Sequence, residues 1–320
     1  MTHGSHIMFE FNDIFVKRNT MKKIQVGFLM SYDYEKLKIS IPPIYKGADA
    51  IFIALDKDYR TWSGQKFEVE ASFFEWLALF DLEKKIILYR DDFYIPQLSP
   101  IENDTRERYM LSLKMGVGNW LIQIDADEIF IDFEKFIKNL RKYDNYLINP
   151  EKHPIQISGY LINIYKYLDE GLLYIEKPTK VMLATNYPNY KVARKTKERI
   201  IYTDNILLHE CLSRTEDELR YKFANWGHSH EINDSFFDKW KSANKDNYKE
   251  LRDVFYLNPK AWKRLGYLPS KDLNDIKEYV QKTENVKVSA LKLISKNFGQ
   301  WFKHAKISKP TYKPKFEKYF

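Results

Sequence analysis

The chain has 320 residues, and its 44% hydrophobic and 30% charged content is that of a globular protein rather than a fibrous or disordered one. Its formal charge of +8 favours an anionic partner, such as a nucleotide, a nucleic acid or an acidic membrane surface. The single cysteine, Cys211, excludes a disulfide framework and a cysteine-based zinc site, and it fits a reducing compartment. No run is apolar enough to predict a membrane span, and residues 1–8 (MTHGSHIM) resemble an expression-vector remnant rather than a signal peptide.

Strand-like and helix-like patterns alternate along the first part of the chain. Helical spacing at 68–82 and 103–118 separates strand-like runs that all end in polar or acidic residues, at 23–30, 48–56, 84–92 and 119–125. This alternation is typical of a parallel, doubly wound sheet. In such sheets ligands bind beyond the carboxyl ends of the strands, where these polar residues fall.

The second of these helices carries recognisable end signals. Asn103 or Asp104 can cap its start, and Gly116 and Gly118 can end it. Its apolar face is predicted to hold Tyr109, Met110 and Leu113.

The pattern changes after residue 132. A helix over 132–143 places Phe133, Phe136, Ile137 and Leu140 on one stripe, and Thr215 with Glu218 forms a capping-box spacing before a helix that ends near Gly227. Strand-like segments at 153–168, 171–185 and 198–212, with a turn at 169–171, predict antiparallel strands that complete a mixed sheet. Beyond about residue 235 the chain is predicted to be mostly helical and basic. The predicted fold class is therefore α/β, with a Rossmann-like mixed sheet and a helical, basic C-terminal region.

Three carboxylates follow the apolar run at 119–125. Asp125, Asp127 and Glu128 lie in the segment DADE, where like charges at a strand end repel unless something positive lies between them. Hard divalent cations such as Mg²⁺ or Mn²⁺ take oxygen ligands, commonly one or two carboxylates plus substrate phosphates. The preceding helix carries Arg106 and Arg108, and arginine is well suited to binding phosphate. Against this, an isolated Asp-x-Asp is more often a solvated strand end, and the chain has a second copy at 56–58.

Two stretches resemble the inverting glycosyltransferases of family 2, which have a two-lobed nucleotide-sugar-binding fold (GT-A). The first is the helix with a basic start, the glycine turn and the Trp-led strand into DADE, and the second is LLHECLSRTEDELRYKFANWGHSHE, 207–231. The resemblance covers about 22–232. It implies a catalytic domain at 22–232, with a nucleotide-sugar-binding part at 22–135 and an acceptor-side part at 136–232, followed by an extension at 233–320.

The resemblance implies roles for several residues. Asp127 would coordinate the metal, Mn²⁺ or Mg²⁺, and Asp125 would reach the metal or the ribose. Asp56 would face the nucleotide base or ribose and Tyr32 would lie near the base, while a late histidine, His228, would complete the metal site or touch the diphosphate. The loop after the first strand (MSYDYEKLKISIPP) lacks the family's usual Pro-Thr-Tyr-Asn run, so the choice of nucleotide stays open.

An inverting transfer needs a carboxylate that takes the proton from the acceptor hydroxyl. Glu210 is predicted to be this base, with Asp204 and Glu231 as rivals, and His209 beside it is expected to be structural. Trp62 either stacks on a sugar or base or anchors a loop. Arg214 and Lys222 are candidates for phosphate contacts, although such residues more often lie on a solvated helix face.

The segment 287–307 has apolar residues at helical spacing beside several lysines. Such a helix can lie on an anionic membrane surface, but the favoured expectation is that its apolar stripe packs on the catalytic domain while the lysines stay in water. The stripe consists of Leu291, Ile294, Phe298, Trp301 and Phe302.

The leading prediction is a metal-dependent enzyme that transfers a sugar, most simply from a UDP-sugar, to a glycan or lipid-linked glycan of the bacterial surface. Its expected location is the cytoplasm, with possible peripheral contact at the inner face of the membrane. One alternative is a haloacid-dehalogenase-type phosphohydrolase, although that motif normally follows the first strand and here three strands precede it. The other is a nucleic-acid-binding protein, but the scattered lysines form no binding motif, so no nucleic-acid partner is expected.

Overall fold

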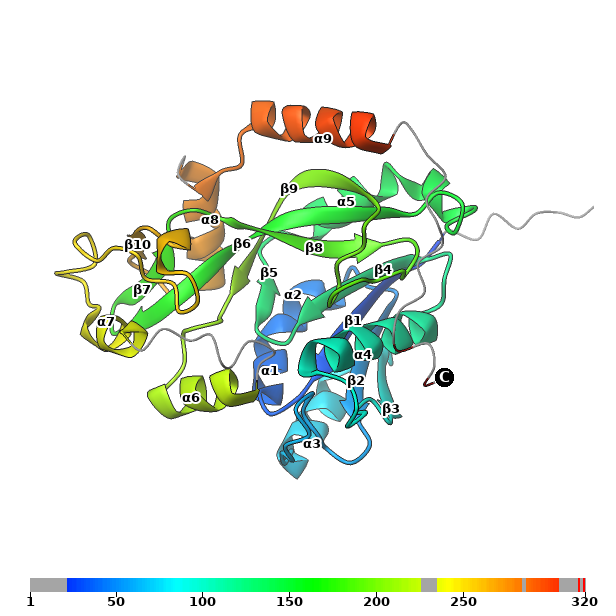
Figure 1. The fold of residues 1–320 in the computed structure, drawn as a ribbon, viewed down its shortest axis with the longest axis horizontal. Helices are drawn as coiled ribbons and strands as arrows, with labels where there is room; N and C mark the ends of the chain where they lie inside the picture. The colour runs from blue at the N-terminus through cyan, green and yellow to red at the C-terminus, as the bar shows by residue number, and fades with distance from the viewer. Residues whose placement is uncertain (1–21, 226–234, 284–285, 305–315, 317–318, 320) are drawn as a thin grey trace, which may run out of the picture.

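A computed structural model describes residues 22–225, 235–283, 286–304, 316 and 319. Its centre is a block of four parallel strands in the order β3-β2-β1-β4, and Figure 1 shows helices on both sides of it. The predicted parallel strands are confirmed: β1 (Ile24–Met30), β2 (Ala50–Asp56), β3 (Ile86–Asp91) and β4 (Trp120–Asp125).

Alternate residues of these strands enter two separate cores, as the two-residue period of a strand requires. In β2, Ile51, Ile53 and Leu55 pack with the helices of one face, whereas Phe52 and Ala54 pack with α4 on the other. The first face is covered by α1 (Leu37–Ser40), α2 (Pro42–Tyr45), α3 (Ala71–Phe80) and α5 (Phe133–Arg141), and the second by α4 (Pro100–Met115).

The helix α4 begins earlier than predicted. Ser99, not Asn103 or Asp104, is its N-cap, and it forms a capping box with Glu102, while Pro100 occupies the first turn. Gly116 ends the helix at φ +94°, as predicted for glycine. The predicted apolar face is wrong at Leu113, which is 46% exposed.

Further strands complete a mixed sheet, as predicted, but the prediction that all of them are antiparallel is wrong for β9 (Arg199–His209), which runs parallel to β6 (Ile155–Leu168). β8 (Thr179–Thr185) pairs antiparallel with β4 and with β6. β6 also pairs antiparallel with β7 (Gly171–Ile175), across the predicted turn. The segment expected as one strand-like run at 171–185 is thus two strands. The described sheet has the order β10-β7-β6-β8-β4-β1-β2-β3, and β9 links it to the short strand β5 (Glu128–Phe130).

The region beyond residue 235 is only partly helical. It contains α7 (Phe236–Ser242), α8 (Leu273–Lys282) and α9 (Ala290–His304), but also β10 (Leu265–Leu268), which pairs with β7 and so extends the sheet. The capping box of Thr215 and Glu218 is present before α6 (Glu216–Asn225). The 3-10 turns are η1 (Tyr34–Lys36), η2 (Asp144–Leu147) and η4 (Pro259–Ala261).

The orientation of α9 contradicts the favoured expectation. Its large apolar residues are exposed instead of packing on the sheet, and the helix lies across β9 at the top of the molecule (Figure 1). Among the described residues, no helix combines the length and the apolar character needed to cross a bilayer.

Candidate active site

The turn between β4 and β5 holds the DADE segment. β4 ends at Asp125, and β5 starts at Glu128 and runs antiparallel to the end of β9, so that Glu128 lies opposite His209. The Glu210 amide donates to the Asp127 carbonyl at 2.8 Å. This pairing brings the acidic turn and the His209-Glu210 pair together, although they are far apart in the sequence.

Asp127 lies among three cationic side chains. Its Oδ2 accepts from Arg214 at 2.8 Å and from Lys222 of α6 at 2.7 Å, and its Oδ1 lies 3.5 Å from Nε2 of His209. Burial acts to raise the pKa of Asp127, but Lys222, His209 and Arg214 together hold this pKa well below its usual range. Asp127 is therefore a buried carboxylate that stays charged because cations surround it.

His209 is itself shifted by this environment. Burial acts to lower its pKa, but Cys211 and Asp127 outweigh burial and raise the pKa to about 10. The ring is then protonated at neutral pH, and its Nδ1 donates to Oδ1 of Asn163 at 2.8 Å. His209 was expected to be only structural, but its protonated ring is the third cationic group that contacts Asp127.

Asp125 is held from one side by Arg108. The Arg108 guanidinium donates through Nε to Asp104 and through Nη2 to Asp125, both at 2.6 Å. A second arginine, Arg194, pairs with both carboxylate oxygens of Glu128, and its Nη2 lies 3.8 Å from Asp125. Arg108 and Arg194 outweigh burial and lower the pKa of Asp125 to about 2. The Asp125 side chain is 36% exposed, against 6% for Asp127, so Asp125 is the carboxylate of this turn that solvent reaches.

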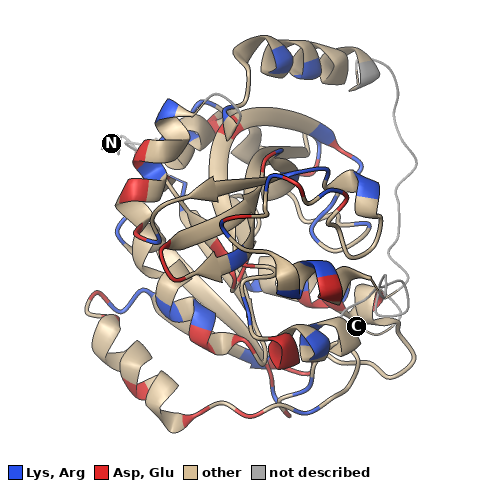
Figure 2. Ribbon diagram, turned by 90° about the vertical axis from the view of Figure 1, so that its left-hand side faces the viewer, with Lys and Arg blue, Asp and Glu red and all other residues tan. Residues whose placement is uncertain are grey.

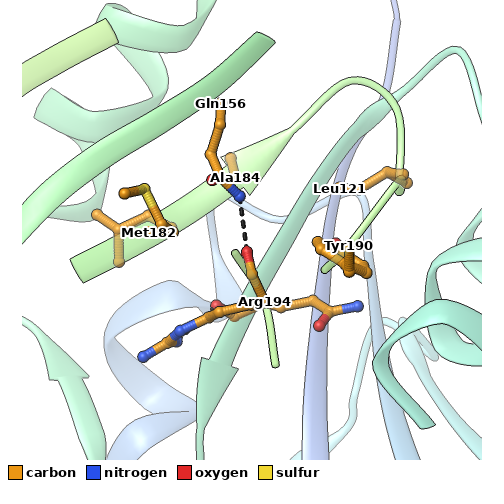
Figure 3. A pocket seen from close by; sticks show the side chains of 8 residues that line it. Leu121, Gln156, Met182, Ala184, Tyr190 and Arg194 are labelled. Carbon is orange, nitrogen blue, oxygen red and sulfur yellow. Dashed lines mark hydrogen bonds between the residues drawn. The ribbon is translucent and has the colours of Figure 1, made fainter. Parts of the chain in front are cut away.

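Arg194 comes from the connection between β8 and β9, which is fastened to the sheet. The Gln156 side chain donates to the Arg194 carbonyl at 2.6 Å (Figure 3), and the hydroxyls of Tyr190 and Ser112 are 3.0 Å apart. These contacts anchor the backbone of the connection, and the Arg194 guanidinium donates to the Gln123 carbonyl at 2.9 Å and to Glu128 of the acidic turn.

Glu210, the predicted base, lies beside this cluster but is not free. Its side chain is buried, accepts from Lys36 at 2.6 Å and accepts a short hydrogen bond from Tyr167. Of its rivals, Asp204 pairs with Lys135 of α5 at 2.7 Å, and Glu231 lies outside the described residues.

The predicted nucleotide contact of Asp56 does not agree with its partners. Both oxygens of Asp56 accept from Arg60, and they also accept from the backbone amides of Asp58, Arg60, Phe93 and Tyr94. A carboxylate has about four lone-pair sites, so little capacity is left for a ribose. Asp56 instead holds together the loops that follow β2 and β3.

The two arginines expected to grip phosphate also have protein partners. Arg106 donates to the carbonyls of Asp92 and Phe93, and Arg108 is committed to Asp104 and Asp125. Both are buried, so these contacts favour a role in positioning the site over direct phosphate binding.

Tyr32, the tyrosine after β1, lies close to the charged cluster around Asp127, and its contact with a nucleotide base stays a prediction. The Tyr32 ring contacts Tyr221 of α6, with ring centroids 4.9 Å apart. Burial, with Asp33 as the next cause, raises the pKa of Tyr32, and Arg214 and Asp127 also act on it. Trp62 anchors a loop, because its indole donates to Glu107 of α4 at 2.6 Å.

The main residues missed from the sequence are the cations. Arg214 and Lys222 were candidates for phosphate contacts or a solvated face, yet both pair with Asp127, and Arg214 also pairs with Asp33 at 2.9 Å. Arg194 and Lys36 were not singled out. The available signal was electrostatic: three carboxylates at a buried strand end require cations nearby, but no spacing identifies which ones.

The predicted metal site is not preformed in the described part of the chain. No group of three His, Cys, Asp or Glu side chains converges there on one point, and Oδ2 of Asp127 already accepts from an ammonium and a guanidinium. His228 lies outside the described residues. As they stand, Asp125 and Asp127 have side-chain cations as partners, and binding of a divalent ion between them stays a prediction.

Comparisons with known proteins leave the family of the chain open. No protein-family model matches it, and no curated protein does either. Among solved structures it resembles mannose-6-phosphate isomerase from Helicobacter pylori, at 12% identity and a TM-score of 0.29. That match covers 64% of this chain and 66% of the other, just under two thirds, and a likeness this low carries no argument about fold or activity.

Proposed function

We propose that the chain is a glycosyltransferase of the GT-A type that takes a sugar from a nucleotide-diphosphate donor, with UDP as the predicted nucleotide. One observation carries the proposal: Arg214, Lys222 and His209 converge on Asp127 at the carboxyl edge of the parallel strands. Such an edge is where open α/β sheets bind ligands. The resemblance of the DADE and WGH stretches to family 2 supports the same reading.

The cations suit the chemistry of a diphosphate leaving group. As the bond from the sugar to the diphosphate breaks, negative charge develops on the diphosphate, and prearranged positive groups stabilise it without reorganising. Arg214 and Lys222 are held in place by Asp127 before any ligand enters. Asp125, the more exposed carboxylate, is left to meet the ribose or the sugar.

A requirement for Mn²⁺ or Mg²⁺ stays a prediction. Lys222, whose side chain is 16% exposed, can meet a diphosphate directly, whereas Arg214, at 3%, adds positive charge from behind Asp127. Measuring nucleotide binding with manganese and with a chelator separates the two routes.

The proton from the acceptor hydroxyl needs a base, and Glu210 remains the predicted one. Its pairing with Lys36 and Tyr167 keeps it at a fixed place beside Asp127. Glu210→Gln should lower turnover by at least about a hundredfold and leave donor binding within about twofold. A bacterial surface glycan, free or lipid-linked, is the proposed acceptor on the resemblance alone.

The test is calorimetric binding of UDP to the wild type and two variants. Lys222→Met removes one cation and should weaken UDP binding about tenfold or more, because a charge-assisted hydrogen bond contributes roughly 1.5–3 kcal/mol. Asp127→Asn should strengthen metal-free binding if the cations bind the diphosphate, or abolish the manganese-dependent part if a metal does. Asp204→Asn, which alters an exposed ion pair of β9 with α5, is the matched control.

Two results count against the proposal. One is a wild type that binds no nucleotide diphosphate with or without manganese, and the other is equal affinity in the wild type, Lys222→Met and Asp127→Asn. If UDP binds as expected, a screen of nucleotide sugars for slow hydrolysis would name the donor. Release of phosphate from a generic aryl phosphate would point instead to the phosphohydrolase alternative.

A further inference from the structure

Helix α9 contacts the sheet through its polar side. Asn297 exchanges two hydrogen bonds with the backbone of Tyr202, at 2.8 and 3.0 Å, and Gln300 accepts from the Ile200 amide at 3.1 Å. These side chains satisfy backbone groups of β9 that would otherwise need another strand or water. The helix is therefore held on the protein by amides rather than by its apolar residues.

The opposite side of α9 is an exposed apolar stripe. Five large side chains at helical spacing are between 53% and 79% exposed, and the aromatic ones contact each other rather than the sheet. Contiguous exposed apolar surface of this kind marks an interaction site, whereas single exposed apolar residues are ordinary. We call these residues the α9 stripe: Leu291, Ile294, Phe298, Trp301 and Phe302.

Lysines lie where α9 meets the sheet, on the side of the helix away from the stripe. Lys296 lies over the Tyr202 ring at 4.9 Å and Lys180 of β8 over the same ring at 5.6 Å. Burial first, and then the charges of Lys292, Lys180 and Lys177, lower the pKa of Lys296. The segment 287–304 contains no Asp or Glu, and Figure 2 accordingly shows basic but no acidic positions on α9.

We propose that the α9 stripe inserts into the surface of an anionic lipid bilayer, and that Lys177, Lys180, Lys292 and Lys296 attract the protein to the lipid phosphates. An amphipathic helix with an apolar face and a lysine-rich polar face binds such a surface by apolar burial and electrostatic attraction together. A second copy of the chain is a poorer occupant, because two stripes face to face would bring two like-charged lysine groups together.

The distance between the α9 contact and the candidate active site bears on how a lipid-linked acceptor could reach the site, a consequence that rests on the proposed function. The docking side contacts β9 at Ile200 and Tyr202, whereas the candidate active site takes His209 from the far end of the strand. At about 3.3 Å per residue, the strand from Tyr202 to His209 spans about 23 Å. A lipid-linked acceptor would then have to bridge this separation along the strand, in addition to the thickness of α9 of about 10 Å.

Vesicle flotation tests the docking without any sugar donor. Wild-type protein is mixed with vesicles of phosphatidylcholine alone or of phosphatidylcholine with phosphatidylglycerol, and binding is expected to the second kind and to fall steeply with salt. Ile294→Ser/Phe298→Ser should weaken binding at least about tenfold. Leu79→Ser/Leu82→Ser, which removes two even more exposed apolar side chains around the end of α3, should bind like the wild type.

Charge is tested in the same way. Lys180→Gln/Lys292→Gln should reduce binding about thirtyfold, since each lysine near such a surface contributes about 1 kcal/mol, and Lys66→Gln/Lys260→Gln is the control. Quenching of tryptophan fluorescence by brominated lipid in the wild type, lost in Trp301→Phe, reports insertion even if a double variant folds poorly.

The proposal is overturned if the wild type stays in solution with both vesicles, or if the stripe variant binds as the wild type does. It is also overturned if sedimentation shows a dimer that the stripe variant dissociates and no vesicle binding occurs. UDP affinity unchanged in the stripe variant would keep this result separate from the proposed transfer reaction.

Discussion

The buried carboxyl of Glu107 should make the stability of the protein depend on pH. Glu107 lies inside α4, is nearly inaccessible to solvent, and accepts a hydrogen bond from the Trp62 indole at 2.6 Å. Burial, reinforced by the nearby Asp104 and Asp56, raises its pKa from 4.5 to about 8, against the opposing effects of Trp62 and Arg108. Glu107 is therefore protonated in the folded protein at neutral pH.

The sign and size of the effect follow from linkage. Between pH 4.5 and 8 the folded chain binds more protons at Glu107 than the unfolded chain does, so stability falls as the pH rises through this window. At 1.36 kcal/mol for each pKa unit, the shift corresponds to a loss of as much as about 5 kcal/mol by pH 8. Glu107→Gln cannot ionise and keeps an oxygen for the Trp62 indole, so it should remove this loss.

The measurement is urea unfolding of the wild type and Glu107→Gln at several pH values. The two should be nearly equally stable at pH 4.5, and the variant should be more stable by several kcal/mol at pH 8. Taking the difference between the two proteins cancels groups such as Asp125 and Asp127, whose lowered pKa values act in the opposite direction at lower pH. Glu75→Gln, on the exposed face of α3, controls for the substitution itself. A difference that stays flat with pH would refute the reasoning.

Three further substitutions test how the fold positions the site. Ser99→Ala removes the capping box of α4 and should cost about 1 kcal/mol of unfolding free energy in urea. Gly171→Ala should cost at least about 2 kcal/mol by the same assay, because Gly171 has φ +129° and a new Cβ would lie 2.2 Å from the Leu268 carbonyl oxygen. Asn297→Ala should release α9 from β9 and speed amide exchange at Tyr202 with little change in global stability; unchanged exchange would contradict the assigned contact.

Much of the parallel half of the fold could be predicted from the sequence. The runs that became β1 to β4 are short, apolar and separated by helical periodicity, and local pattern decides such elements because burial follows the period of the side chains. The place of the DADE turn followed as well, since parallel strands end at one edge of a sheet. The N-cap of α4 was predicted a few residues too late, because several residues near its start are competent caps.

The partners of the charged residues could not be predicted in this way. Asp56 and Asp127 both follow strands in an Asp-x-Asp pattern, yet Asp56 is enclosed by backbone amides and Arg60, whereas Asp127 meets Arg214 and Lys222 from distant segments. Ion pairing acts through space, so the residues that neutralise a carboxylate depend on the pairing of β5 with β9 and on the position of α6.

Helix α9 also shows what the sequence determines and what depends on the assembled sheet. Its sequence determined an amphipathic helix, because apolar residues at helical spacing need only local geometry. Which side faces the protein was decided by the exposed edge of β9, whose backbone groups took the amides of Asn297 and Gln300 and left the apolar side outward. Hydrogen bonds to an unpaired strand edge exist only once the sheet is assembled, so only the tertiary structure could decide this orientation.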